Sequence, residues 1–195
     1  MPCQNEELRR ELVAMAALDL EMRENLIRRG VIFDGYHPEM EAIHVRNASR
    51  LKEILAEYGW PVPALVGDDG AEAAWLIVQH AIGDPPLQRQ CLRLLQDAAQ
   101  SGEVPLWQSA MLEDRIRMFE GKPQLYGTQL ETDSEGALRP YLLEEPECVE
   151  ERRSKVGLEP LSKRLARERP SPKPAAPARF ESEYQAWLSR VGWRS

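Results

Sequence analysis

The chain has 195 residues, a formal net charge of −7 and 43% hydrophobic residues. This length suits one domain of about 150 residues with a terminal extension. The acidic balance disfavours nucleic acid as a partner, because proteins that bind nucleic acid usually present a basic face. No secretory signal opens the chain, no apolar run reaches about 18 residues, and the cysteines form no CxxC pair. We therefore expect a cytoplasmic protein with reduced thiols and no membrane segment.

Glycines and prolines divide most of the chain into helical segments. Glycines such as Gly30 and Gly59 follow periodic segments and suit the left-handed position that closes a helix. Prolines such as Pro38 and Pro85 suit a first helical turn. The predicted helices cover residues 5–29, 38–58, 69–82, 85–101, 105–120 and 146–156.

A β-hairpin is predicted between the last two of these helices. Residues 124–130 and 137–143 are extended-looking runs, and the segment between them is rich in turn-forming residues. The pattern thus predicts a mainly α protein, a compact multi-helix bundle with one β-hairpin, over residues 1–165. A C-terminal proline-rich linker and a short amphipathic helix complete the expected organisation.

The last part of the chain differs in composition from the body. Residues 166–179 are rich in proline and basic residues, which predicts a semi-rigid linker. Residues 180–195 follow as an aromatic amphipathic tail, and one helical face carries Phe180, Tyr184, Trp187, Leu188 and Val191. So short a helix needs a surface to pack on. We expect the segment Phe180–Trp193 to dock on its own body, on a second copy in a homodimer, or on a partner protein.

Polar residues interrupt the apolar stripes of the first three helices. Asp19 falls in the stripe of the first helix, and His44 and Asn47 fall in that of the second. The apolar run 73–81 ends with the pair Gln79 and His80. Because buried polar groups must be hydrogen-bonded, we expect Asp19 to pair with Arg23 or with an imidazole.

Further polar residues lie in the fifth helix and the hairpin. Asp114 falls in an apolar seam of the helix, with Arg115 beside it. In the first strand, alternation would place Gln124, Tyr126 and Thr128 on one face, with Gln129 at its end. Each of these groups alone has a structural explanation, such as an intrahelical ion pair or a satisfied core residue. Together they are easier to explain as the lining of one cavity.

Standard nucleotide, hydrolase and metal motifs are absent from the sequence. It contains no GxGxxG, GxxxxGK[ST], GxSxG, HExxH or EF-hand pattern, so we expect no cofactor. His44 and His80 could share a metal ion with Asp19 or Asp114. No local ligand spacing supports such a site, however, and we expect no metal.

Several motifs resemble those of a bacterial family known only as a domain of unknown function. They are the GWP at 59–61, LVG at 65–67, AAWLIVQHA at 73–81, EDR at 113–115 and QLYGTQ at 124–129. The resemblance covers about residues 10–162 and implies a bacterial, mainly helical domain, with His44, Gln79, His80, Asp114, Arg115, Gln124, Tyr126 and Gln129 in its recurring polar set. Family members often have Gln where this chain has Leu20, and an acid where it has Ile82.

Two classes of function follow from these residues. The first is an enzyme acting on a small polar or anionic molecule, with His80 or His44 as general acid or base and Asp19 or Asp114 as the orienting carboxylate. Arg115 would bind the anion, and Gln79, Gln124, Tyr126 and Gln129 would bind the ligand by hydrogen bonds. The second is a non-catalytic module that senses a ligand in the same pocket or binds a protein through the aromatic tail.

Overall fold

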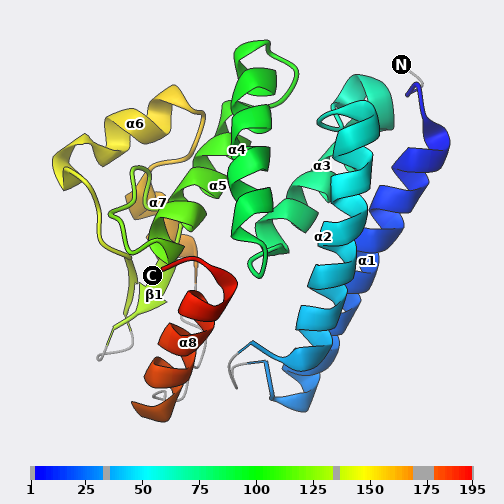
Figure 1. Ribbon diagram of the computed structural model, residues 1–195. Coiled ribbons are helices and arrows are strands. Elements are labelled where there is room, and N and C mark those ends of the chain that lie inside the picture. Colours follow the sequence, from blue (N-terminus) through cyan, green and yellow to red (C-terminus); the bar gives the residue numbers. More distant parts are fainter. Residues whose placement is uncertain (1–2, 33–35, 134–136, 169–177, 195) are drawn as a thin grey trace. The chain divides into compact units, whose positions relative to one another are not determined.

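The computed structural model describes residues 3–32, 36–133, 137–168 and 178–194 (Figure 1). The chain divides into two compact units, Met1–Val104 and Pro105–Ser195. Among the described residues, helices dominate and the only sheet is a two-stranded antiparallel hairpin. The prediction of a mainly helical protein with one hairpin is therefore confirmed.

The first unit consists of four helices. They are α1 (Glu6–Arg29), α2 (Pro38–Tyr58), α3 (Pro63–His80) and α4 (Pro85–Gln100). The predicted bounds agree closely for α1, α2 and α4, and the Asp84 side chain caps α4 by accepting a bond from the Leu87 amide. Helix α3 begins before its predicted start at residue 69, because Pro63 opens a first turn. Gly67, at φ 71° and ψ 170°, then kinks the helix without ending it.

Helices α1 and α3 start together and run in the same direction. The backbone amide of Asn5 donates to the Leu65 carbonyl, and Arg9 forms a paired bond with Asp69, which lies 60 residues further along the chain. A Cβ on Gly70 would lie 2.9 Å from the Val66 side chain and 3.3 Å from that of Arg9, so glycine leaves room for both side chains. At about 1.5 Å per residue, both helices extend for roughly 20 Å from these first contacts to Asp19 on α1 and its partner His80 on α3.

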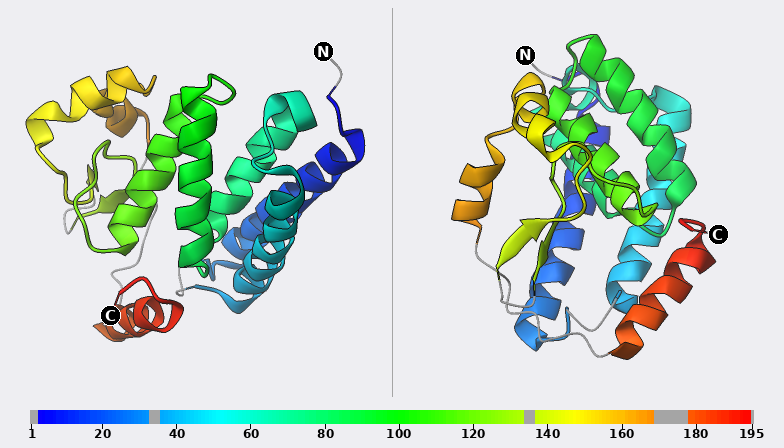
Figure 2. Two further views of the ribbon diagram at one scale, coloured as in Figure 1. Left: turned by 45° about the horizontal axis from the view of Figure 1, so that its top comes forward. Right: turned by 90° about the vertical axis from the view of Figure 1, so that its left-hand side faces the viewer.

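Helices α1 and α2 lie side by side and run in opposite directions (Figures 1 and 2). The Arg50 guanidinium binds the Glu11 carboxylate, and the Asn47 amide donates to the Met15 carbonyl. Moving four residues forward along α1 thus corresponds to moving three residues backward along α2. The next step in this register places His44 opposite Asp19.

The second unit contains shorter elements. They are α5 (Leu106–Phe119), β1 (Leu130–Thr132), β2 (Leu138–Pro140), the 3-10 helix η1 (Pro146–Cys148), α6 (Val149–Lys155), α7 (Leu161–Arg167) and α8 (Ala178–Val191). The hairpin register pairs Glu131 with Arg139. Strand β1 overlaps the predicted run 124–130 only at Leu130, whereas β2 lies within the predicted run 137–143. Helix α7 ends at Arg167, inside the predicted linker, whereas residues 169–177 lie outside the described part of the chain.

The aromatic tail folds as helix α8 and packs on its own unit. Trp187, Leu188 and Trp193 are buried, and Phe119 at the end of α5 stacks on Trp193 with ring centroids 5.0 Å apart. The Arg194 guanidinium donates to the Phe119 carbonyl, which caps the end of α5. The predicted docking of the tail on a hydrophobic surface is confirmed for the chain's own body, while the Phe180 side chain lies outside the described residues. A homodimer or partner complex through the tail stays a prediction.

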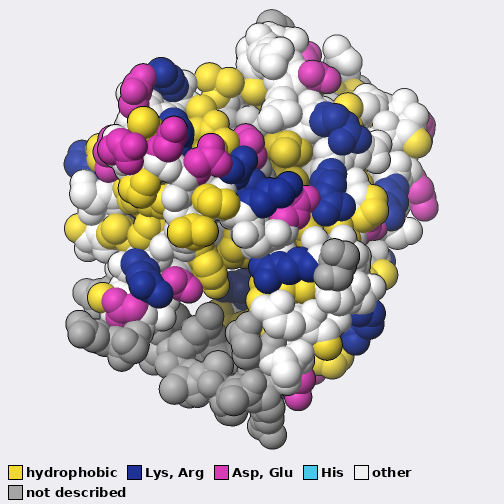
Figure 3. Space-filling view, turned by 60° about the vertical axis from the view of Figure 1, so that its left-hand side comes forward, with side chains coloured by type: hydrophobic (Ala, Val, Ile, Leu, Met, Phe, Trp, Pro, Cys, Tyr) yellow, Lys and Arg dark blue, Asp and Glu magenta, His cyan; other side chains and the backbone are white. Residues whose placement is uncertain are grey.

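The surface carries mixed charge on the face shown in Figure 3. Acidic, basic and hydrophobic side chains are interspersed there. Among the described helices, none combines the length and apolar character that a bilayer crossing demands.

Candidate functional site

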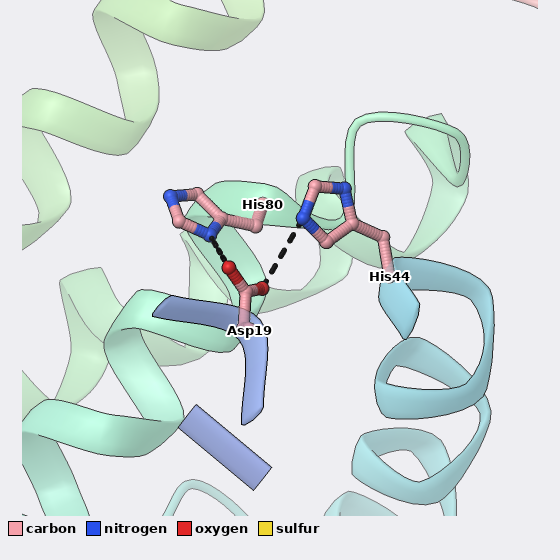
Figure 4. A group of neighbouring side chains, drawn as sticks. All are labelled: Asp19, His44 and His80. Atoms are coloured by element: carbon pink, nitrogen blue, oxygen red, sulfur yellow. Dashed lines mark hydrogen bonds and ion pairs between the residues drawn. The ribbon is translucent and has the colours of Figure 1, made fainter. Parts of the chain in front are cut away.

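Three residues predicted from the sequence meet in the first unit. The Asp19 carboxylate of α1 lies between His44 of α2 and His80 of α3 (Figure 4). Its Oδ1 atom is 2.8 Å from His80 Nδ1, and its Oδ2 atom is 3.2 Å from His44 Nε2. The two imidazole centroids are 5.3 Å apart. One carboxylate thus contacts two imidazoles. We call the three residues Asp19, His44 and His80 the Asp–His cluster.

Helix geometry explains why these side chains converge. Asp19 and His44 both lie in the buried stripes of their helices. His80 is the last residue of α3, where unpaired carbonyl groups favour a positively charged imidazole. The prediction that Asp19 pairs with Arg23 or an imidazole is resolved in favour of the imidazoles.

Burial and charge act against each other at Asp19. Only 1% of its side chain is exposed, and this burial by itself would raise its pKa. The close contacts of His44 and His80 with the carboxylate, together with the charges of both imidazoles, outweigh burial and hold the pKa of Asp19 well below its ordinary value. The carboxylate therefore stays ionised in the interior, where it stabilises positive charge on either ring.

Tyr36 contacts the far side of His44. Its hydroxyl group lies 2.7 Å from His44 Nδ1, and the two rings stack with centroids 5.6 Å apart. Burial, followed by the charges of Glu41 and Asp19, raises the pKa of Tyr36, so the side chain remains a neutral phenol. This contact fixes the orientation of the His44 ring and directs its Nε2 atom to Asp19 (Figure 4).

The contact between His44 and Asp19 is close but is not a well-formed hydrogen bond. His44 Nε2 and Asp19 Oδ2 are both buried, and neither has a hydrogen-bond partner of good geometry among the described residues. Asp19, His44 and His80 can each direct one ligand atom to a common point, since these atoms lie within 4.8 Å of one another. The cluster can therefore hold a proton or a metal ion between its members.

A small cavity of about 300 Å³ adjoins the cluster. Its wall is partly polar and consists of Tyr36, His44, Val45, Ala48, Ser49, Lys52, Ala81, Gly83 and Asp84. Lys52 forms an ion pair with Asp84 at this wall. The side chain of His80 is 21% exposed, and the next residue in sequence, Ala81, lines the cavity. The volume is at the lower end of the range for small-molecule sites.

Gln79 is buried beside the cluster in sequence, on helix α3. Both polar atoms of its side chain lack a hydrogen-bond partner among the described residues. Its backbone carbonyl accepts a bond from the buried Gln88 amide. The predicted role of Gln79 in ligand binding stays a prediction.

Asp114 belongs to the second unit, and backbone amides bind its carboxylate. Oδ1 accepts bonds from Leu125 and Tyr126 at 2.8 and 3.1 Å, and Oδ2 accepts a bond from Thr128 at 2.9 Å. Residues 124–129 consequently form a tight loop, and Gly127 within it has φ 64°. The extended strand predicted here, with alternate residues on one face, is wrong because Asp114 draws the successive amides toward one point.

The loop at residues 124–129 is closed by further internal bonds. The buried Gln124 amide donates to the Gln129 carbonyl and accepts from the Gln129 amide, at 3.0 and 2.7 Å. The fully buried Arg153 of α6 donates to the carbonyls of Tyr126 and Glu159, both at 2.7 Å. The polar groups of this loop thus stabilise the second unit, and their predicted ligand-binding role stays a prediction.

The rest of the α5 seam differs from its prediction. Among the seam residues Trp107, Met111, Asp114 and Met118, only Asp114 is fully buried. The buried face contains Gln108, Leu112, Ile116 and Phe119 instead. Arg115 is half-buried in the second unit, and its role in binding an anion stays a prediction.

Two residues of the site escaped the sequence analysis. Tyr36 precedes the start of α2, and Lys52 lies on the same helix as His44. Residue spacing could have indicated Lys52, because it lies two helical turns beyond His44 and therefore on the same side of the helix. No periodicity marks Tyr36, because it lies in a loop.

Comparison with known proteins identifies a family but no activity. Neither the curated proteins nor the solved structures contain a match to this chain. The model of one protein family matches residues 6–168, which include the Asp–His cluster and the loop at residues 124–129. This match confirms the resemblance noted in the sequence motifs. The chain belongs to the family of unknown function DUF6624.

Proposed function

We propose that the protein is an enzyme that transfers protons to or from a small polar or anionic molecule. The observation that carries the proposal is the buried, ionised Asp19 carboxylate bound by two imidazoles, one of which lines a cavity. Imidazole is the side chain whose charge changes most readily near neutral pH. A carboxylate beside an imidazole orients the ring and balances the charge that forms when the ring accepts a proton.

The arrangement suggests a role for each residue. His44 lies in the cavity wall with its two ring nitrogens on Tyr36 and Asp19, so it would exchange a proton with a bound molecule through the Tyr36 hydroxyl group. His80 is partly exposed and donates through Nδ1 to Asp19, so its Nε2 atom is the nitrogen that exchanges protons with its surroundings. Asp19 compensates the charge that forms on either ring.

The cavity indicates the class of substrate. Its volume suits a small molecule, and Ser49 and Tyr36 offer hydroxyl groups for hydrogen bonds. Lys52 supplies a positive charge at the wall, although Asp84 already binds it, so the cavity also tolerates uncharged polar molecules. Lys52 takes the anion-binding role that the sequence analysis gave to Arg115.

The test is a search for conversion that depends on the two histidines. Purified protein is incubated with pools of phosphate esters, carboxylic acids and nucleosides, and NMR follows their consumption. His80→Asn keeps a donor near Nδ1 and His44→Gln keeps a polar atom near Nε2, but neither amide exchanges protons near neutral pH. We expect each variant to lose activity by about 100-fold or more.

His37 provides the matched control for this test. It is the third histidine of the chain and caps α2 by accepting a bond from the Glu39 amide. His37→Asn preserves a capping side chain and should leave the activity unchanged. Conversion that persists at the wild-type rate in both cluster variants would sink the proposal. A molecule that binds in the cavity and is never converted would favour the non-catalytic alternative.

A further inference from the structure

We propose that Asp19, His44 and His80 bind one divalent transition-metal ion, for which zinc is the test ion. The inference rests on the proposed function, because it names a cofactor for the same site. The three residues come from three different helices, which explains why no local ligand spacing revealed the site in the sequence.

The distances between the ligand atoms fit a shared ion. Zinc bonds to imidazole nitrogen and carboxylate oxygen are about 2.0–2.2 Å long. Two ligands at about 2.1 Å from one ion are about 3.0 Å apart at a right angle and about 3.4 Å apart at a tetrahedral angle. The separations of 2.8 Å from Asp19 Oδ1 to His80 Nδ1 and 3.2 Å from Asp19 Oδ2 to His44 Nε2 lie on either side of the first of these values, and each involves a different oxygen of the carboxylate.

The unsatisfied atoms of the cluster point to the same conclusion. His44 Nε2 and Asp19 Oδ2 face each other at 3.2 Å in the interior, without a hydrogen bond of good geometry. Two buried acceptor atoms at this separation repel unless a proton or a metal ion lies between them. A metal ion would bind both atoms, and the negative charge of Asp19 would balance part of the positive charge of the ion.

The chemistry of the ligands selects the class of ion. Two imidazole nitrogens and one carboxylate suit zinc and other first-row transition ions, whereas magnesium and calcium prefer sites made of oxygen ligands. Tyr36 contacts the other nitrogen of His44, and contacts of this kind orient imidazoles in metal sites. Three protein ligands also leave coordination positions open.

An ion at this position would change how the site performs its chemistry. Water bound to it releases a proton far more readily than free water does. The released proton would pass to solvent, which would leave a base beside the cavity, and Asp19, His44 and His80 would hold the ion. The proposed acid and base roles would pass from the rings to the bound water.

Calorimetry on the full chain tests the inference directly. Protein treated with a chelator and dialysed is titrated with zinc, and we expect one ion per chain. Asp19→Asn, His44→Gln and His80→Asn should each weaken binding by about 100-fold or more, because each removes a ligand. His37→Asn should bind zinc as the wild type does, and a tenfold excess of magnesium should not compete. Binding that persists unchanged in the cluster variants would overturn the inference.

A second measurement on the wild-type chain avoids variants that fail to fold. With ¹⁵N-labelled histidine, zinc should shift the ring nitrogens of two histidines and leave those of His37 unchanged. Zinc that instead binds the cysteines would leave all three rings unshifted and would contradict the proposal. Failure of the two proposals is distinguishable. Histidine-dependent turnover by protein that binds no zinc would refute the metal site alone, and a bound ion without turnover of any pool would refute only the enzyme.

Discussion

Two buried carboxylates, one in each unit, differ in the groups that bind them. Asp19 is bound by the imidazoles of two other helices, and Asp114 is bound by the backbone amides of one loop. Imidazoles gain and lose protons near neutral pH, whereas backbone amides do not. The same residue type, equally buried, therefore lies between two titratable rings in one unit and holds a loop in the other.

The pKa values of the two carboxyl groups move in opposite directions. At Asp19 the imidazoles outweigh burial and lower the pKa. At Asp114 burial is the larger influence and raises the pKa, although bonds from Thr128, Leu125 and Tyr126 partly offset it. Burial alone thus says little about the role of a carboxylate, and the identity of its donors is the more useful guide.

The largest effect is expected from Asp114→Asn. The new amide nitrogen would face backbone donors that require an acceptor, and the charge that strengthens these bonds would be lost. We expect the second unit to lose about 3 kcal/mol or more of unfolding free energy. Urea unfolding gives the total loss, and hydrogen exchange should show faster exchange at residues 124–129. The exposed Glu147→Gln is the control, and an equal loss in both variants would contradict the assigned role.

Arg153→Lys tests the same loop from its other side. Arg153 donates to two carbonyls, those of Tyr126 and Glu159, and a lysine cannot reach both from one nitrogen atom. The expected loss is about 2 kcal/mol, measured by urea unfolding. Arg152→Lys, at a partly exposed neighbouring position, should cost less. A similar cost at both positions would show that Arg153 is not a specific support of the loop.

Asp19→Asn should affect chemistry more than stability. The asparagine oxygen can still accept from His80, and its nitrogen can donate to His44, so both imidazoles keep a partner. We expect a stability loss of only about 1–2 kcal/mol, with loss of zinc binding and of any activity. Thermal unfolding with and without zinc measures both, because a ligand at 100 times its Kd stabilises by about 2.7 kcal/mol. If Asp97→Asn, an exposed control, also abolished the zinc effect, the cluster would not be the binding site.

The smallest effect is expected from Tyr36→Phe. It removes the hydroxyl group 2.7 Å from His44 Nδ1 and keeps the stacked ring. The stability loss should be below about 1 kcal/mol, while the ¹⁵N spectrum of His44 should show an altered distribution of the proton between its two nitrogens. An unchanged spectrum would indicate that Tyr36 does not orient this ring.

Local patterns in the sequence determined much of the fold. Pro38 and Pro85 begin helices as predicted, and Gly30 and Gly59 end them. Periodicity also placed Asp19 and His44 on buried helix faces, because the face of a helix depends only on residue spacing. Spacing alone did not reveal the kink at Gly67, so the predicted start of α3 at residue 69 came after its observed start at Pro63.

Only the tertiary structure decided which polar residues meet. Periodicity assigns a residue to a face but leaves the axial register of two helices open. That register depends on distant contacts, such as the pair of Arg9 with Asp69, which brings His80 level with Asp19. Residue spacing failed for the same reason at residues 124–129, where it predicted an extended strand. The backbone amides there instead turn toward the Asp114 carboxylate, which accepts their hydrogen bonds. The sequence by itself placed Asp19, His44 and Asp114 in buried stripes, and tertiary contacts decided whether imidazoles or backbone amides bind the two carboxylates.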